Sequence, residues 1–440
     1  MTKALAFALA FSLPGCLGSI TPHRSAIGDD KTADLESAQS ISDGGVNDSS
    51  SDASLPASSS DAGGGDTRNP DLSIAAGKVP IFLAQGAVGR TTISCDDGQT
   101  WIGNRSWDSE ADPIMCGMAQ QATCYTGTCS YEINNQCVSM QCCNDTPDVA
   151  KGVAYNDGVF VGAWGWGQPG DVRRSTDGIH WTSTHAGDNY GGVAYGAGKF
   201  VAISRAPISS PDGTTWALDP AADFRSNGSP TGTQLWSIRR VAFADYQGGR
   251  FIGIADSDLL TSADAGQTWQ RPNNFPSECF GNIMAYGDIL YGNGTIVIIQ
   301  ESGTACRSID GGTTWSSTST GQTVLSRGVF TDGKFVIWGD HIRLSSPDGV
   351  NWTTTATNVR LEGAVARSAA GTYIADANLY TGYSQQTLYR SSDGVNWQEL
   401  APGAFVKSHP FFAITFGYAD ASACAIGQPM TITASSGPIR

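Results

Sequence analysis

The chain has 440 residues, of which 15% are charged and 54 are Gly, and its formal net charge is −15. An acidic chain repels phosphate backbones, so we expect no nucleic-acid partner. The high Gly content is typical of many short strands joined by turns, which favours one large repeat domain with a tail over several ordinary domains.

Residues 1–16 have the layout of an export signal. Lys3 precedes an apolar run at 4–13 that is too short to span a bilayer. The segment closes with Leu13-Pro14-Gly15-Cys16, which resembles a bacterial lipobox. This resemblance implies that Cys16 is lipidated and becomes the mature N-terminus. The alternative is an ordinary cleaved signal, which would make the protein secreted.

Residues 17–76 are rich in Ser, Asp, Gly and Ala and contain no aromatic residue. Such a segment cannot bury enough apolar area to offset its ordering entropy, so we expect a disordered tether. It is similar to the tails of envelope lipoproteins from myxobacteria and their relatives. That similarity implies a location in the cell envelope, at the outer membrane or cell surface, with membrane contact only through the lipid anchor.

Eleven Cys are present, and ten remain when Cys16 is set aside. An even number in an exported chain predicts disulfides. Six of the ten fall within a Cys-rich insertion at 106–150, which contains no His, so disulfides are favoured there over a zinc knuckle. The sequence leaves their pairing open and predicts neither a metal nor a cofactor. The six are Cys116, Cys124, Cys129, Cys137, Cys142 and Cys143.

One motif, Ser-x-Asp-(x)-Gly-x-x-Trp, recurs seven times and is called the corner motif below. Its Asp can accept backbone N–H groups within a turn, its Gly can adopt positive φ, and its Trp ring can bury a large apolar area. The copies lie roughly 35–55 residues apart, except for one wider gap, which is the period of a blade-like repeat. The copies run from Ser94 to Trp101, Ser175 to Trp181, Ser210 to Trp216, Ser262 to Trp269, Ser308 to Trp315, Ser346 to Trp352 and Ser391 to Trp397.

An apolar hairpin with a Gly-containing turn precedes most copies of the corner motif. A third strand leads into the motif and a fourth follows its Trp, which predicts a four-stranded antiparallel blade. The expected hairpins pair 152–155 with 159–162, 192–195 with 199–202, 240–243 with 250–253, 282–286 with 295–298, 328–330 with 334–337 and, more weakly, 364–366 with 372–375.

The corner motifs and hairpins resemble the Asp-box (BNR) repeats of the sialidase-like superfamily, which also occur in xyloglucanases, sortilin-type receptors and photosystem assembly factors. The resemblance covers the chain from about residue 79 to the C-terminus. It implies an all-β protein, with a seven-bladed β-propeller of four-stranded antiparallel blades at 77–440. In those families the box is structural and lies away from the active site.

The two ends of the repeat region are each incomplete. Residues 81–101 carry a corner motif but only part of a hairpin, and residues 411–432 carry strands but no motif. We expect the two ends to complete one blade, which would remove the exposed sheet edges. A disulfide between Cys95 and Cys424 would lock this closure, and one between Cys279 and Cys306 would staple a single blade.

In such a blade the corner motifs lie on one face, and the longer connections lie on the other. The ligand site is therefore expected on the second face, near the axis. The insertions that fall on that face are 106–150, 164–171, 219–238, 271–280 and 377–386.

The residues that enter the innermost strands from this second face should surround the axis. Three of them are cations, which favours a pocket for a carboxylate or sulfate. The alternative is that they pair with acids such as Glu362 and plug the channel. The aligned residues are Lys151, Arg239, Arg327, Glu362 and His409.

Two Trp residues outside the corner motifs, Trp164 and Trp166, lie in one of the insertions. They could stack on sugar rings or pack onto the Cys-rich insertion. Tyr380 and Tyr383 raise the same question.

Enzyme and binder predictions differ in the residues they need. The Phe/Tyr-Arg-Ile-Pro signature of sialidases is missing. A polysaccharide lyase would need His and Tyr near Arg, for which His341, His409 and Tyr190 are available. Another glycoside hydrolase would need two facing carboxylates. The candidates are Asp171, Asp188, Asp256, Asp258, Glu301, Asp340 and Glu362.

We therefore expect a monomeric binder of a glycan or an envelope protein. The alternative is a carbohydrate-active enzyme acting on anionic polysaccharide, and a third class is an assembly factor.

Overall fold

The computed structural model describes strands and turns between residues 77 and 425. The chain divides into two units, Met1–Leu55 and Pro56–Arg440, and every described residue belongs to the second. The expected signal, Cys16 and the tether lie outside the described residues. So does the Cys-rich insertion, apart from two short strands and its last two residues. The described ranges are 77–86, 91–102, 132–133, 136–137, 149–165, 170–218, 238–255, 259–272, 274–280, 288–323, 325–361, 363–376, 388–400 and 411–425.

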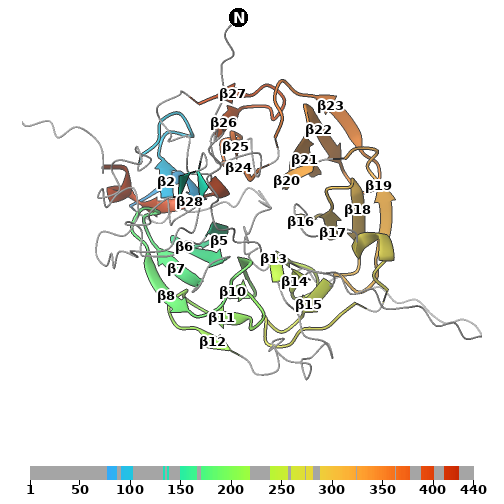
Figure 1. The fold of residues 1–440 in the computed structure, drawn as a ribbon, viewed down its shortest axis with the longest axis horizontal. Coiled ribbons are helices and arrows are strands. Elements are labelled where there is room, and N and C mark those ends of the chain that lie inside the picture. The colour runs from blue at the N-terminus through green and yellow to red at the C-terminus, as the bar shows by residue number, and fades with distance from the viewer. Residues whose placement is uncertain are drawn as a thin grey trace, which may run out of the picture. The chain divides into compact units, whose positions relative to one another are not determined.

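Seven antiparallel sheets in the described residues form the blades (Figure 1). The first four, each given from its innermost strand outward, consist of β28 (Phe411–Asp420), β1 (Lys78–Gly86) and β2 (Thr91–Ser94); β5 (Val149–Asn156), β6 (Val159–Gly165), β7 (Asp171–Ser175) and β8 (Thr182–Ala186); β9 (Gly192–Gly196), β10 (Lys199–Ile203), β11 (Ile208–Ser210) and β12 (Ala217–Leu218); and β13 (Ile238–Ala244), β14 (Arg250–Ala255) and β15 (Leu259–Ser262).

The remaining three blades each contain four strands. They consist of β16 (Asp288–Gly292), β17 (Thr295–Ile299), β18 (Thr304–Ser308) and β19 (Ser316–Ser319); β20 (Leu325–Thr331), β21 (Lys334–Gly339), β22 (Ile342–Ser346) and β23 (Thr353–Ala356); and β24 (Val365–Arg367), β25 (Tyr373–Asp376), β26 (Leu388–Ser391) and β27 (Gln398–Glu399). A separate two-stranded sheet pairs β3 (Glu132–Ile133) with β4 (Gln136–Cys137). The 3-10 helices η3 (Ser277–Phe280) and η4 (Ala421–Ala425) are short, and no helix in the described part of the chain has the length and apolarity that a membrane crossing requires.

The innermost strands contact one another in a closed circuit, β5, β9, β13, β16, β20, β24, β28 and back to β5. This confirms the predicted seven-bladed propeller. Two blades depart from four full strands, because their outermost strand is reduced to a single bridge. These bridges join Ile93 to Ile102 and Thr261 to Gln270.

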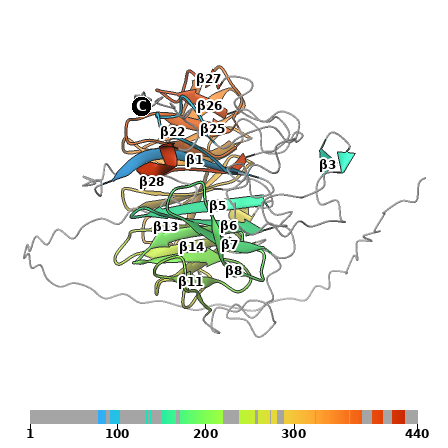
Figure 2. The same ribbon diagram turned by 90° about the vertical axis from the view of Figure 1, so that its left-hand side faces the viewer.

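The predicted closure of the ring by the two chain ends is confirmed. β1 pairs with β28 from Lys78 opposite Asp420 to Gly86 opposite Phe411, and the two strands lie side by side in Figure 2. Cys95 and Cys424 form a disulfide with a Cα–Cα distance of 5.9 Å. The second predicted disulfide also forms, between Cys279 on η3 and Cys306 on β18.

One predicted hairpin is wrong. The partner of Thr295–Ile299 is Asp288–Gly292, with Gly292 opposite Thr295, and residues 282–286 take no part in that pairing. The apolar run at 282–286 suggested a strand, but the Asn293-Gly294 turn fixes the register. Asn293 and Gly294 both have positive φ, which a two-residue type I′ hairpin turn requires, so the strand that precedes the turn is the five residues Asp288–Gly292.

The corner motifs share one hydrogen-bond pattern between the third and fourth strands. In the copy that begins at Ser175, the Ser175 hydroxyl donates to Asp177 Oδ1 at 3.0 Å and accepts the N–H of Gly178 at 2.8 Å. Asp177 Oδ1 also accepts the N–H groups of Ile179 and His180. Trp181 Nε1 donates to the Gly178 carbonyl at 3.0 Å. The motif thus satisfies its own turn while placing the Trp ring in the core.

Two copies differ in the last contact. In the copy that begins at Ser210, Trp216 Nε1 donates to Thr184 Oγ1 at 3.0 Å.

The copy that begins at Ser391 differs in another way. Trp338, from the preceding blade, donates to the Gly394 carbonyl at 2.7 Å. Trp397 packs at right angles to Trp338, with ring centroids 5.8 Å apart, and its buried Nε1 has no partner among the described residues. The Gly394 carbonyl therefore accepts an indole N–H from the neighbouring blade, whereas in most copies the equivalent carbonyl accepts the indole N–H of its own motif.

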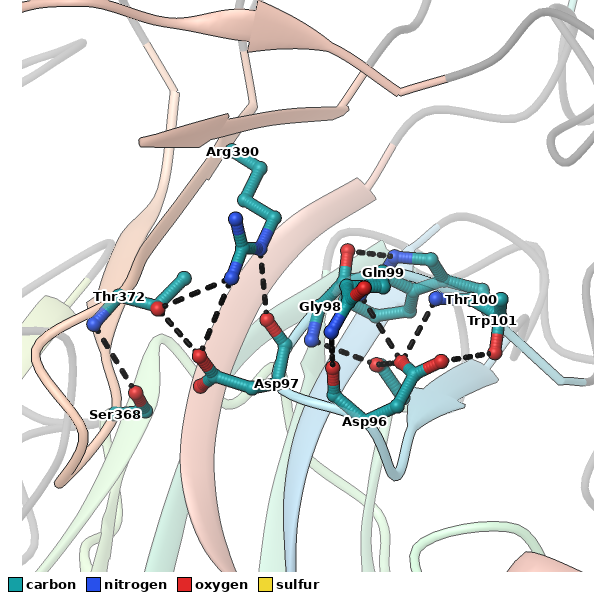
Figure 3. A network of polar contacts seen from close by, with 10 residues as sticks. Asp96, Asp97, Gly98, Gln99, Thr100, Trp101, Ser368, Thr372 and Arg390 are labelled. Atoms are coloured by element: carbon teal, nitrogen blue, oxygen red, sulfur yellow. Dashed lines mark hydrogen bonds and ion pairs between the residues drawn. The ribbon is translucent and has the colours of Figure 1, made fainter. Parts of the chain in front are cut away.

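The first corner also ties the seam between the β24–β27 blade and the closing blade (Figure 3). Asp97 has a φ of 58°, and its carboxylate accepts the hydroxyl of Thr372 and an Arg390 guanidinium N–H, the latter at 3.3 Å. Arg390 Nε also donates to the Asp97 carbonyl at 2.9 Å. Side-chain contacts thus join the N-terminal strands to a blade almost 300 residues later in the sequence.

The corner carboxylates make the fold sensitive to acid. Burial alone would raise the pKa of Asp177, but hydrogen bonds from His180 and Ile179 outweigh it and hold the pKa below the ordinary 3.8. The other six motif carboxylates also have a lowered pKa. Groups with a lowered folded-state pKa contribute stability above the unfolded-state value, and that stability is lost as the pH falls through the folded-state value.

We therefore expect the free energy of unfolding to fall steeply below about pH 4. Urea denaturation at a series of pH values measures the slope, which is about 1.4 kcal/mol per pH unit for each proton taken up on unfolding. The variants Asp177→Asn and Asp348→Asn should each lower that uptake by about one proton. Asp332→Asn, in an exposed ion pair outside the motifs, is the control. An unchanged slope in both motif variants would contradict the assignment.

Candidate functional site

Three innermost strands have a β-bulge near their first residues. These first residues lie at the end of the strand that is opposite the corner motifs. The register shifts between Ala150 and Gly152 in β5, between Ile238 and Arg240 in β13, and between Leu325 and Gly328 in β20. A bulge inserts a residue without a ladder partner and re-aims the side chains beside it. The bulges occur where the chain enters the inner strands from the face opposite the corner motifs.

A cavity lies at the axis, among these strand ends. Its volume is about 10 Å³, which is room for about one water molecule. Four of its lining side chains are charged: Lys151, Arg240, Asp288 and Arg327. The rest of the lining is backbone and apolar surface, from Gly152, Gly191, Gly192, Val193, Val241 and Ile289. This space is called the axial cavity below.

Asp288 is the one carboxylate in this lining. Asp288 is 2% exposed, and its Oδ2 accepts the N–H of Gly328 at 2.9 Å. Burial raises the pKa of Asp288, and the charges of Arg240 and Arg327 oppose this rise. Arg327 is itself only 6% exposed. A buried carboxyl group and a buried guanidinium therefore both line the cavity, on adjacent blades.

The sequence-predicted ring residues have different outcomes. Lys151 and Arg327 line the axial cavity. Arg239 lies on β13, but its side chain lies outside the described residues, and the cation that lines the cavity from β13 is Arg240. Glu362, His409, Trp166, Tyr380 and Tyr383 lie outside the described residues.

The expectation that Trp164 offers an exposed face to a ligand is wrong. Trp164 is 1% exposed and packs edge-on against Trp181, with ring centroids 5.6 Å apart. The guanidinium of Arg173 lies over its ring at 4.7 Å. Gly162 leaves room for the indole on the same strand, since a Cβ there would come within 2.5 Å of the ring. Trp164 is a core residue between two blades.

The predicted catalytic carboxylates show no facing pair in the described residues. Asp171 is buried, and both of its oxygens accept Arg173 Nε, at 2.8 and 3.0 Å. Asp340 is exposed and contacts His341 at 2.8 Å. Glu301 is partly exposed next to the turn before β18. Asp256 and Asp258 lie outside the described residues.

The predicted lyase residues are not brought together among the described residues. The ring next to Tyr190 is that of His185, with centroids 6.2 Å apart, rather than that of His341. Asp188 follows His185 by three residues and lies 3.7 Å from a guanidinium nitrogen of Arg205. Burial lowers the pKa of His185, and the charge of Asp188 opposes this. Tyr190 is fully buried, which removes it from contact with a polymer substrate.

Sequence reasoning missed Arg240 and Asp288. Both occupy the repeat position of Gly152 and Gly192, at the start of an inner strand. The signal was therefore present as charged residues where two other blades have Gly. Asp288 was missed because the predicted hairpin used residues 282–286 in its place. Arg240 was missed because its neighbour Arg239 was aligned with Lys151 and Arg327. The described residues contain no group of His, Cys, Asp and Glu placed to hold a metal ion.

No protein-family model and no curated protein matches the chain. Among solved structures it is similar to YCF48 bound to D1 peptide, with 13% identity over 70% of this chain and 84% of that chain and a TM-score of 0.40. It is also similar to an ancestral GH74 enzyme, with 14% identity over 50% of this chain and 32% of that chain and a TM-score of 0.38. A third is apo AztD from Citrobacter koseri, with 8% identity, 78% and 98% coverage and a TM-score of 0.40. Similarity at this level bears on neither ligand nor activity.

Proposed function

We propose that this protein binds a glycan or envelope-protein ligand that carries an anionic group, on the propeller face opposite the corner motifs. The observation that supports this most directly is the set of cations at the axis. Lys151, Arg240 and Arg327 line one cavity, and Asp288 is the single carboxylate in its described lining. In a chain with a formal charge of −15, a local excess of cations attracts and orients anionic groups.

The size of the axial cavity limits how such a ligand is held. A cavity of about 10 Å³ does not admit a sugar ring or a peptide, so the ligand lies across the mouth. Long loops on a rigid scaffold commonly supply binding contacts, and we expect the insertions of this chain to supply them here. A carbohydrate-active enzyme is the second candidate, and it would need a second carboxylate from outside the described lining.

Two finer assignments belong to the same proposal. We assign the corner motifs to the Asp-box class because all seven share the Ser, Asp and Gly contacts of that turn. We also propose that the chain is anchored through a lipid on Cys16, from its lipobox-like sequence. Mass spectrometry of the N-terminal peptide tests the anchor, and an unmodified peptide beginning elsewhere would contradict it.

Glycan-array binding with turnover assays on the hits tests the proposal. Lys151→Ala and Arg240→Ala should each weaken binding of anionic hits about tenfold, because each removes a charge-assisted contact worth about 1.5 kcal/mol. Neutral hits should be unaffected.

Arg250→Ala is the matched control, since Arg250 begins β14 at the opposite end of the strands. Equal binding of anionic hits by wild type and both axial variants would refute the cation-centred site. Release of reducing ends from a hit would move the protein to the enzyme class.

A further inference from the structure

We propose that the axial cavity is a binding site for one small monovalent anion, with chloride as the occupant. The ion would lie among Lys151, Arg240 and Arg327, beneath the mouth where a larger ligand binds. This site uses the same three cations as the proposed function, but its tests need neither a glycan nor a protein partner, so the two can fail separately.

The size of the cavity selects the class of ligand. A volume of about 10 Å³ accommodates one water-sized group. A halide ion is close to water in size, whereas a carboxylate or sulfate brings several heavy atoms. The cavity therefore has room for a single halide ion.

The charge of the lining selects the sign of the ligand. Three cationic side chains and one carboxylate face a small volume at the axis. Arg327 and Asp288 are desolvated, and charges interact more strongly there than in water. A monovalent anion is attracted by the three cationic groups that line this volume.

Glycines leave the room for such an ion. Gly152 and Gly192 line the cavity, and neither has the positive φ that requires Gly. A Cβ on Gly152 would lie 3.6 Å from Gly192 Cα and Val193 N, which is ordinary contact. A Cβ on Gly192 would lie 3.6 Å from Val241 N and 3.7 Å from Arg240 Cα. Ala fits the backbone at both positions, so the effect of Gly there is to leave space at the axis.

Thermal unfolding of the full chain at constant ionic strength provides the first test. Sodium gluconate, whose anion is too large for the cavity, is replaced stepwise by sodium chloride or sodium bromide. The wild-type midpoint should rise by about 3 °C with either halide, because an anion that binds only the folded state stabilises it. No halide-specific rise would overturn the proposal.

Two kinds of variant locate the effect. Gly192→Ala fills the cavity without removing charge, and Lys151→Met removes one cation from a half-buried position. Both should lose most of the halide response. Lys199→Met, at the start of β10 on the corner side, should keep it. An undiminished response in Gly192→Ala would place the ion elsewhere and overturn the proposal.

Bromide can also be located directly. Crystals grown in sodium bromide should show an anomalous peak bounded by Lys151, Arg240 and Arg327. Anomalous peaks confined to the outer surface would mean adventitious ions only, and would overturn the proposal.

Discussion

Replacing Cys95 and Cys424 together by Ala should lower the free energy of unfolding by about 5–6 kcal/mol. The two residues are separated by 329 positions, so their disulfide closes nearly the whole propeller into one loop. In the chain-entropy account, a cross-link that closes a longer loop removes more freedom from the unfolded state. The bond also holds the end of β2 to η4, within the blade that the two chain ends build together. Urea denaturation of both proteins under non-reducing conditions measures the difference.

The second disulfide is the control, because Cys279 and Cys306 are only 27 positions apart. From the length of its loop, removing this disulfide should lower the free energy of unfolding by about 3.5 kcal/mol. The structural effect should be confined to one blade. Hydrogen exchange separates the two cases. Loss of the Cys95–Cys424 bond should expose the amides of β1, β2 and β28, whereas loss of the other bond should leave those amides protected. Unchanged protection of β1 in the first variant would show that the bond is not needed to close the ring.

Asp288→Ala should lower the free energy of unfolding by about 3–5 kcal/mol. The substitution leaves the buried Arg327 near Arg240 without the axial carboxylate, and it leaves the Gly328 N–H without its acceptor. Removing a buried carboxyl group that lies near two cations costs far more than breaking an exposed pair. Asp288→Asn keeps the shape and an acceptor oxygen, so its cost of about 2 kcal/mol isolates the charge.

Asp332→Ala is the matched control for Asp288. Asp332 is paired with Arg367 at 3.2 Å, but its side chain is 70% exposed. Its loss should cost less than about 1 kcal/mol. Urea denaturation at neutral pH compares the three variants with wild type. Equal costs for Asp288→Ala and Asp332→Ala would show that the axial carboxylate lacks the role assigned to it.

The number of blades could be read from the sequence because the corner motif is a local structure. Each copy supplies its own Asp acceptor, its own Gly and its own Trp within eight residues, so the Ser, Asp and Gly contacts of the turn are the same wherever it occurs. The period of the repeat then gives the blade, and the count gives the ring. The pairing of Cys95 with Cys424 followed from the same reasoning, since incomplete ends of a closed ring must meet.

The axial cavity could be predicted only in part. Repeat alignment placed Lys151 and Arg327 at strand starts that line the cavity. The side chain of Arg239 lies outside the described residues, and alignment did not single out Arg240, which lines the cavity from β13. The sequence pattern predicted a loop at Trp164, but β6 extends to Gly165 and the Trp164 ring is buried. Pattern reasoning sees the order of residues, whereas burial depends on what the neighbouring blade brings against them.

By itself, the sequence determined the seven corners, the four-stranded blade, the closure and two disulfides, because each depends on contacts within one repeat or on the need to complete the ring. Only the tertiary structure decided that Arg240 and Asp288 face the axis and that Trp164 does not face a ligand. Those outcomes depend on contacts between blades, where residues far apart in the chain compete for the same small volume.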